Sequence, residues 1–78
     1  MTTLAEVTIT VQDVRRTHCI FGARQWFRAH DLDFRDFVRH GVSAQVMWGT
    51  GDELGRQVVR RKLDDLGLAD ILEVLDGQ

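Results

Sequence analysis

A chain of 78 residues is long enough to bury one modest core and too short for two domains or a deep, enclosed active site. Hydrophobic residues make up 44% and charged residues 28%, as in folded rather than disordered proteins. The net charge of -2 argues against a dedicated nucleic-acid binder, and one cysteine is too few for an internal disulfide. We therefore expect one small domain over residues 1–78.

The first residues lack the basic start and apolar stretch of a signal peptide. No apolar run approaches the roughly 20 residues that a helix needs to cross a bilayer. We therefore expect a cytoplasmic product without contact to a membrane.

Charge is divided along the chain. All 10 basic residues lie between residues 14 and 62, and the segment after Lys62 contains five acidic residues and no basic ones. The acidic tail either balances the basic face within the molecule or leaves that face open to a phosphate backbone or an acidic partner.

The first predicted element is a strand within an extended arm at residues 1–11. Val7, Ile9 and Val11 alternate with threonines, the pattern of a half-buried strand. No other segment alternates comparably, so the backbone of this strand must pair with a second strand elsewhere, a neighbouring subunit or water. An unpaired edge would accept a partner by strand addition, which makes these three residues candidates for partner binding.

Three helices are predicted before residue 41, at the start of a helical core over residues 12–63. Thr10 and Asp13 form a capping box for a short helix that ends near residue 16. The next helix, at residues 21–30, has an apolar face of Ala23, Trp26 and Phe27. Asp33 can cap a third helix, at 34–40, and Gly41 can end it.

Two further helices complete the core, and an acidic helix is expected over residues 64–78. Ser43 can cap a short helix at 44–48, and Thr50 with Glu53 forms a capping box for a helix at 52–63. The apolar positions of that longer helix are Leu54, Val58, Val59 and Leu63. The expected fold is therefore mainly α, a small bundle of four to five short helices with an N-terminal β-strand.

No catalytic or metal-binding constellation is recognisable. The soft ligands His18, Cys19, His30 and His40 lack the short spacings of a metal site, and Cys19 is more simply a small core residue. Asp33 and Asp36 are explained by helix capping. We therefore expect neither an enzyme nor a bound cofactor or metal.

A basic strip and two tryptophans are the remaining candidates. The strip is either a solvated face or a contact surface, and the tryptophans either fill the core or anchor an interface. The resulting candidates for partner binding are Trp48, Arg56, Arg60, Arg61 and Lys62. A helix-turn-helix reading of 34–40 and 44–48 is weakened because the second helix is mostly apolar and offers few groups for base edges.

One resemblance adds a biological setting. The pattern Cys19-x-x-Gly22-Ala23-Arg24-x-Trp26-Phe27, then His30-x-Leu32-Asp33-Phe34-x-x-Phe37 and Thr50-Gly51-Asp52, resembles small uncharacterised proteins of tailed bacteriophages and prophages of Gram-negative bacteria. It covers roughly residues 7 to 60 and transfers no functional residue.

The resemblance implies a phage setting, in which small proteins act mainly by binding. We expect a minor virion structural or assembly component of the head, connector or tail, located in the virion or the host bacterial cytoplasm. Its partners would be other phage structural proteins or a host protein, and a small core also suits a homo-oligomer. The alternatives are an inhibitor of a host defence or regulatory protein and a small helix-turn-helix DNA-binding protein.

Overall fold

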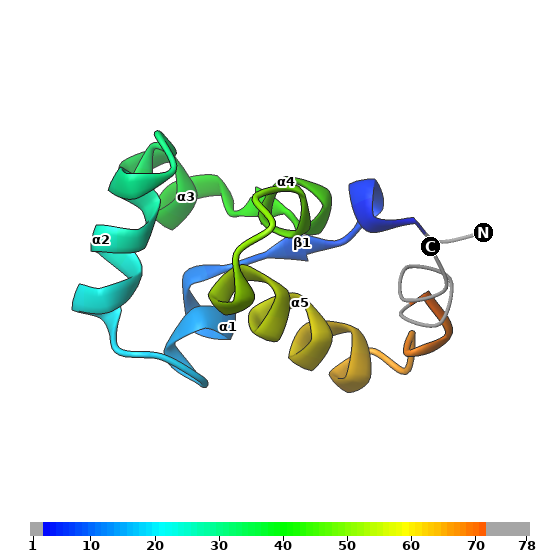
Figure 1. Ribbon diagram of the computed structural model, residues 1–78. Coiled ribbons are helices and arrows are strands. Elements are labelled where there is room, and N and C mark those ends of the chain that lie inside the picture. The colour runs from blue at the N-terminus through cyan, green and yellow to red at the C-terminus, as the bar shows by residue number, and fades with distance from the viewer. Residues whose placement is uncertain (1–2, 72–78) are drawn as a thin grey trace.

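The computed structural model describes residues 3–71 and confirms the mainly α class (Figure 1). The elements in chain order are the 3-10 helix η1 (Leu4–Glu6), β1 (Thr8–Ile9), α1 (Val11–Arg15), α2 (Ile20–Ala29), α3 (Phe34–His40), β2 (Val42–Ser43), α4 (Ala44–Gly49) and α5 (Glu53–Asp65). The four helices expected between residues 21 and 63 are all present, with ends shifted by no more than two residues.

The N-terminal strand has a partner within the chain. β1 pairs antiparallel with β2, which places Thr8 opposite Ser43 and Ile9 opposite Val42. The strand is shorter than the alternation over residues 6–11 predicts, because η1 precedes it and α1 begins directly after Thr10.

The strand side chains belong to the core. Val7 is 4% exposed and Ile9 is 0% exposed, and Val11 packs against the buried cluster. In this fold a partner cannot reach the side chains of Val7 and Ile9 without opening the core, and strand addition at this segment stays a prediction.

Three of the predicted helix caps are confirmed. The Asp13 backbone N–H donates to Thr10 Oγ1 at 3.4 Å, and the Thr10 N–H donates to Asp13 Oδ2 at 2.8 Å, which completes the capping box of α1. Asp33 accepts from the N–H of Asp36, and Ser43 accepts from the N–H of Gln45. Each cap satisfies a backbone donor that the first helical turn leaves free.

The predicted capping box of α5 is wrong. The cap is Asp52, whose Oδ1 accepts from the Leu54 N–H at 2.9 Å. Thr50 instead accepts from the Asp52 N–H at 3.3 Å and donates to the Met47 carbonyl at 2.8 Å. Thr50 therefore forms a hydrogen bond at the end of α4, and Asp52, which lies directly before α5, is the cap of α5.

Gly41 allows α3 to meet the sheet. Its φ of 76° lies in the region that favours glycine, and its ψ of -176° leads into β2 rather than into a left-handed turn. A Cβ at this position would lie 2.8 Å from the Ile9 carbonyl oxygen and 2.6 Å from the Thr8 methyl carbon. The close approach of the α3–β2 connection to β1 therefore requires glycine.

One core joins the elements. α5 packs against α4, α1 and β1, and in Figure 1 the strand runs between α4 and α5. The largest fully buried side chains are Phe27, Phe37, Ile9, Met47, Leu63, Val14, Val58 and Val59. Leu68 and Ile71 also pack on this cluster beyond a turn at Gly67, but most of the helix expected over residues 64–78 lies outside the described residues.

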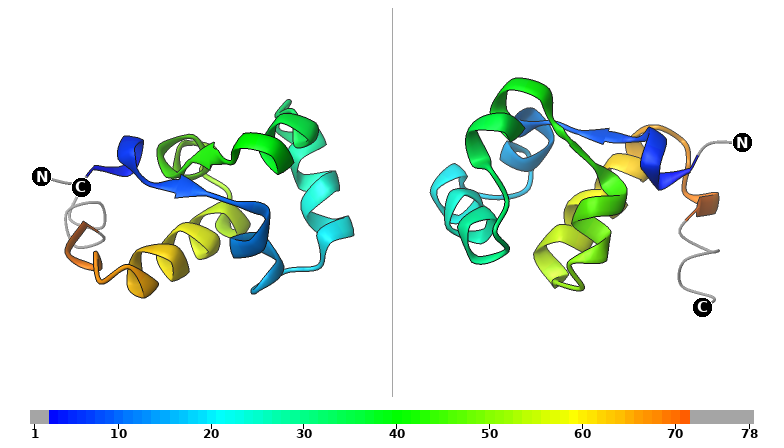
Figure 2. Two further views of the ribbon diagram at one scale, coloured as in Figure 1. Left: turned by 180° about the vertical axis from the view of Figure 1, so that it is seen from behind. Right: turned by 90° about the horizontal axis from the view of Figure 1, so that it is seen from above.

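The molecule has two distinct ends. Its principal dimensions are 31 × 21 × 19 Å. α2 and α3 form one end, and the last turn of α5 with residues 66–71 forms the other (Figures 1 and 2). The arginines of α2 and α3 are therefore separated from the start of the acidic segment.

Candidate functional site

The structure places one tryptophan beneath two arginines. Trp48 comes from α4, and Arg56 and Arg60 come from successive turns of α5, which packs against α4. The guanidinium carbon of Arg56 lies 4.8 Å from the centroid of the Trp48 ring, and that of Arg60 lies 5.5 Å from it. Both distances suit cation–π contact. We call these three residues the Trp48 platform.

The platform follows from helical spacing. Residues four apart lie on the same face of a helix, so Arg56 and Arg60 extend over the same side of α4. The Arg60 Nη1 also donates to Glu53 Oε1 at 3.1 Å, which fixes the outer guanidinium from one side. The Arg56 Nε is buried and has no hydrogen-bond partner within residues 3–71. All three side chains are half-buried, so part of each remains open to a partner.

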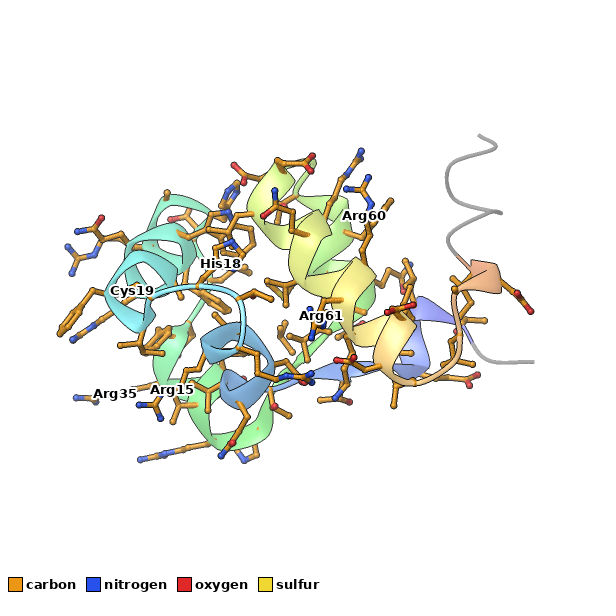
Figure 3. The ribbon with its side chains drawn as sticks, turned by 90° about the horizontal axis from the view of Figure 1, so that it is seen from below. Arg15, His18, Cys19, Arg35, Arg60 and Arg61 are labelled. Atoms are coloured by element: carbon orange, nitrogen blue, oxygen red, sulfur yellow. The ribbon has the colours of Figure 1, made fainter. Side chains whose placement is uncertain are left out.

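The other two basic candidates do not join the platform. Figure 3 shows Arg60 and Arg61 leaving α5 on different sides. Arg61 Nε lies 3.5 Å from an oxygen of Asp65, and Lys62 Nζ lies 3.0 Å from Asp13 Oδ2. The structure therefore divides the predicted basic strip into two arginines over Trp48, of which Arg60 also pairs with Glu53, and two residues that form ion pairs away from the platform.

The pair between Lys62 and Asp13 ties α5 to α1. The two side chains are only 21% and 11% exposed. Burial raises the pKa of Asp13, but the Thr10 N–H, the Lys62 ammonium and the Thr10 hydroxyl together lower this pKa below its ordinary value. Asp13 thus serves as both a cap and an ion-pair partner, and Lys62 has a structural role.

Charge balance within the molecule is partial. Asp65 Oδ2 accepts from Arg16 Nη1 at 2.6 Å, in addition to its contact with Arg61. Asp64 and Asp70 are exposed and have no ion-pair partner in the described range. At the opposite end, a set of exposed arginines also lacks ion pairs among residues 3–71: Arg15, Arg24, Arg28, Arg35 and Arg39.

A histidine and an acid meet near the start of α5, in an arrangement that serves the fold. His30 Nε2 lies 3.7 Å from Asp52 Oδ2, and the His30 ring lies 4.5 Å from the Trp26 ring. The Leu54 N–H and then the Trp26 side chain lower the pKa of Asp52, against a smaller effect of burial. The Trp26 Nε1 is buried and has no partner with hydrogen-bond geometry in the described chain. Asp52 is already used as the cap of α5.

Cys19 is exposed, so the prediction that it lies in the core is wrong. It occupies the N-cap of α2 and makes no side-chain cap hydrogen bond. The side chains of Cys19 and its neighbour His18 are labelled in Figure 3. His18 Nδ1 lies 2.7 Å from the Thr17 hydroxyl. Within residues 3–71 no group of three or more His, Cys, Asp or Glu side chains is placed to hold a metal ion.

A surface on α2 was missed at the level of sequence. Phe21 is 71% exposed, and Phe21, Arg24, Gln25 and Arg28 line an open depression of about 150 Å³. A second depression of about 380 Å³ lies beside it, lined by Arg24, Arg28, Asp31, Leu32, Asp33 and Phe34. Positions 21, 24 and 28 share one helical face, which lies opposite the buried Trp26. The sequence signal for this surface is an aromatic residue, Phe21, that lies outside the apolar face of its helix and four or fewer residues from an arginine. The candidates for partner binding listed from the sequence do not include it.

No protein-family model, curated protein or solved structure matches this chain. None of the helices in residues 3–71 is long and apolar enough to span a bilayer.

Proposed function

We propose that this chain is a non-enzymatic phage protein that acts by protein–protein contacts, as a minor structural or assembly component of the head, connector or tail. The phage setting is supported by the pattern that runs roughly from residue 7 to residue 60. Action through contacts is supported by the Trp48 platform, and this is the observation on which the proposal chiefly depends.

The platform has the composition of a binding hot spot. Tryptophan and arginine are the residues most enriched where truncation costs an interface the most binding energy. Because Arg56 and Arg60 already lie over the indole, these two side chains lose less conformational entropy when a partner binds. Two guanidinium groups beside a ring suit a protein surface that presents carboxylates next to an apolar or aromatic group.

The geometry of α4 favours protein contacts over base reading. Ala44 and Met47 are buried, and the exposed side chains of this helix are those of Gln45 and Val46. One amide and one isopropyl group offer little for the donor and acceptor pattern of a major groove. The helix-turn-helix alternative therefore has no support from the surface of its second helix.

Quantitative mass spectrometry of purified virions encoded alongside this gene tests the proposal. A fixed copy number per particle supports a structural role, and absence from assembled and partly assembled particles overturns it. Trp48→Ala should lower incorporation, because it removes the ring beneath both arginines. Gln57→Ala is the matched control, since Gln57 is exposed on α5 and belongs to no contact of the platform. Both variants should give the circular dichroism spectrum of the parent protein before incorporation is compared.

A further inference from the structure

The two most exposed large hydrophobic side chains of the described residues lie at opposite ends of the molecule. Phe21 is 71% exposed on α2, and Leu66 is 50% exposed just beyond α5. The two regions lie far apart in each view of Figures 1 and 2. The charged side chains that border the depression at Phe21 are basic, whereas the exposed charges near Leu66 in sequence that have no ion pair in residues 3–71 are the acids Asp64 and Asp70.

The basic end is built on α2. Arg24 and Arg28 are exposed, have no ion-pair partner in residues 3–71, and line both depressions beside Phe21. Asp31 and Asp33 also line the larger depression, and Asp33 caps α3, with its Oδ1 3.1 Å from the Asp36 nitrogen. The smaller depression, next to Phe21, is bordered by no acidic side chain. We call Phe21, Arg24 and Arg28 the α2 face.

The acidic end has the complementary chemistry. Leu66 is flanked in sequence by Asp64 and Asp70, both exposed and without an ion pair in the described chain. Asp65, between them, contacts the two arginines Arg16 and Arg61 and is not counted among the free acids. The sequence continues with Glu73 and Asp76 among apolar residues. We call Asp64, Leu66 and Asp70 the acidic end.

We propose that the acidic end of one copy docks on the α2 face of the next, so that the protein associates head to tail with itself. Leu66 would contact Phe21, and the carboxylates of Asp64 and Asp70 would pair with the guanidinium groups of Arg24 and Arg28. Unlike patches in contact make a heterologous interface, which generates a ring when its rotation closes and a filament when it does not. The proposal deepens the proposed function, on which it rests for its biological setting.

A second copy fits this surface better than the same copy does. The long dimension of the molecule is 31 Å, and the segment after α5 lies at the end opposite α2 (Figure 1). Charge complementarity between the two ends is therefore satisfied between copies rather than within one.

Sedimentation velocity of the purified chain over a concentration series reaching the millimolar range tests the proposal. We expect concentration-dependent association that weakens as salt screens the charges. Arg24→Glu with Arg28→Glu, and separately Asp64→Lys with Asp70→Lys, should each weaken association at least roughly tenfold. An equimolar mixture of the two double variants should associate again, because each then meets the opposite charge at both of its ends.

The matched control is Arg35→Glu with Arg39→Glu. These arginines have the same spacing on α3, are exposed and lie outside both depressions, so the variant has the same net charge as the α2 variant. It should change the association constant by no more than about twofold. All substituted residues are exposed, and unchanged circular dichroism and melting temperature would establish that each variant is folded.

Three results would overturn the proposal. One is a wild-type chain that stays monomeric throughout the series. Another is a dimer that both double variants still form, or a mixture that fails to associate. The third is a monomer whose α2 face binds labelled duplex DNA with steep salt dependence, which would make nucleic acid the occupant. A monomer present in virions overturns the self-association alone, whereas a self-associating chain absent from virions overturns the proposed function alone.

Discussion

Alanine at Gly55 and at Gly22 should have opposite effects on stability. Gly55 is the third residue of α5, and Gly22 is the third residue of α2. Alanine therefore gains a similar helix propensity at both positions, of no more than about 1 kcal/mol. A Cβ at Gly55 would lie 2.8 Å from the Met47 carbonyl oxygen and 3.0 Å from the Cζ2 carbon of Trp26. The backbone oxygen cannot yield unless α4 shifts. A Cβ at Gly22 meets nothing within 4 Å.

The magnitudes set the expected signs. Overpacking a close contact costs roughly 1–3 kcal/mol, which exceeds the propensity gain, so Gly55→Ala should destabilise by about 1–2 kcal/mol. Gly22→Ala should stabilise by roughly 0.5–1 kcal/mol. For a domain of this size, 1 kcal/mol corresponds to roughly 4–8 °C in melting temperature. Urea denaturation followed by circular dichroism measures both changes. If Gly55→Ala raised the free energy of unfolding as Gly22→Ala does, the packing of α5 on α4 described above would be refuted.

Three further predictions concern the ends of helices and acidic pH. Gly41→Ala should cost at least about 1–3 kcal/mol in urea denaturation, because a side chain there is strained and meets the Ile9 carbonyl; an unchanged midpoint would contradict the close approach. Asp13→Asn should lower the free energy of unfolding by about 1 kcal/mol in the same assay, since it removes the ion pair with Lys62 and weakens the cap of α1. If Lys62→Met lowered it by this amount and Asp13→Asn did not, the dual role of Asp13 as cap and ion-pair partner would be contradicted. The pKa values of Asp13 and Asp52 are lowered on folding, so their contribution is fully present above the ordinary value of 3.8 and is lost as pH falls through the folded values. The free energy of unfolding of Asp13→Asn should therefore fall less steeply in acid than that of the parent, and parallel profiles would show the assignment to be wrong.

The helices could be predicted because their signals are local. A helix cap and the apolar face of a helix each involve residues within a few positions of one another. They can therefore be recognised without knowledge of the tertiary structure. Asp33 and Ser43 cap the helices that follow them, and Ala23, Trp26 and Phe27 form a buried face. Thr50 and Asp52 can each cap a helix, so the difference in free energy between the two choices is small and a local pattern does not decide it. The structure has Asp52 as the N-cap of α5.

The contacts between distant segments could not be predicted in the same way. β2 is two residues long, so it has no alternation to recognise, and the Gly41 turn brings it to β1. The partners of Arg61 and Lys62 depend on how α5 packs on α1 and on where α5 ends. Exposure of Cys19 likewise reflects the position of α2 at one end of the molecule.

The arginine pairs show how packing gives different roles to one sequence pattern. Arginines four residues apart occur at 24 and 28, at 35 and 39, and at 56 and 60, and the spacing alone does not distinguish them. Tertiary structure places the last pair over Trp48 and the first beside the exposed ring of Phe21. The middle pair has neither an ion pair nor a cation–π contact within residues 3–71.

An arginine contributes most to binding where an apolar neighbour excludes water from its ion pair, since exposed pairs contribute little. Reversing the charges at 24 and 28 should therefore impair self-association, and reversing those at 56 and 60 should impair incorporation into virions. The same change at 35 and 39 should leave both intact. Equal losses for all three pairs would show that net charge, rather than the two surfaces, controls binding.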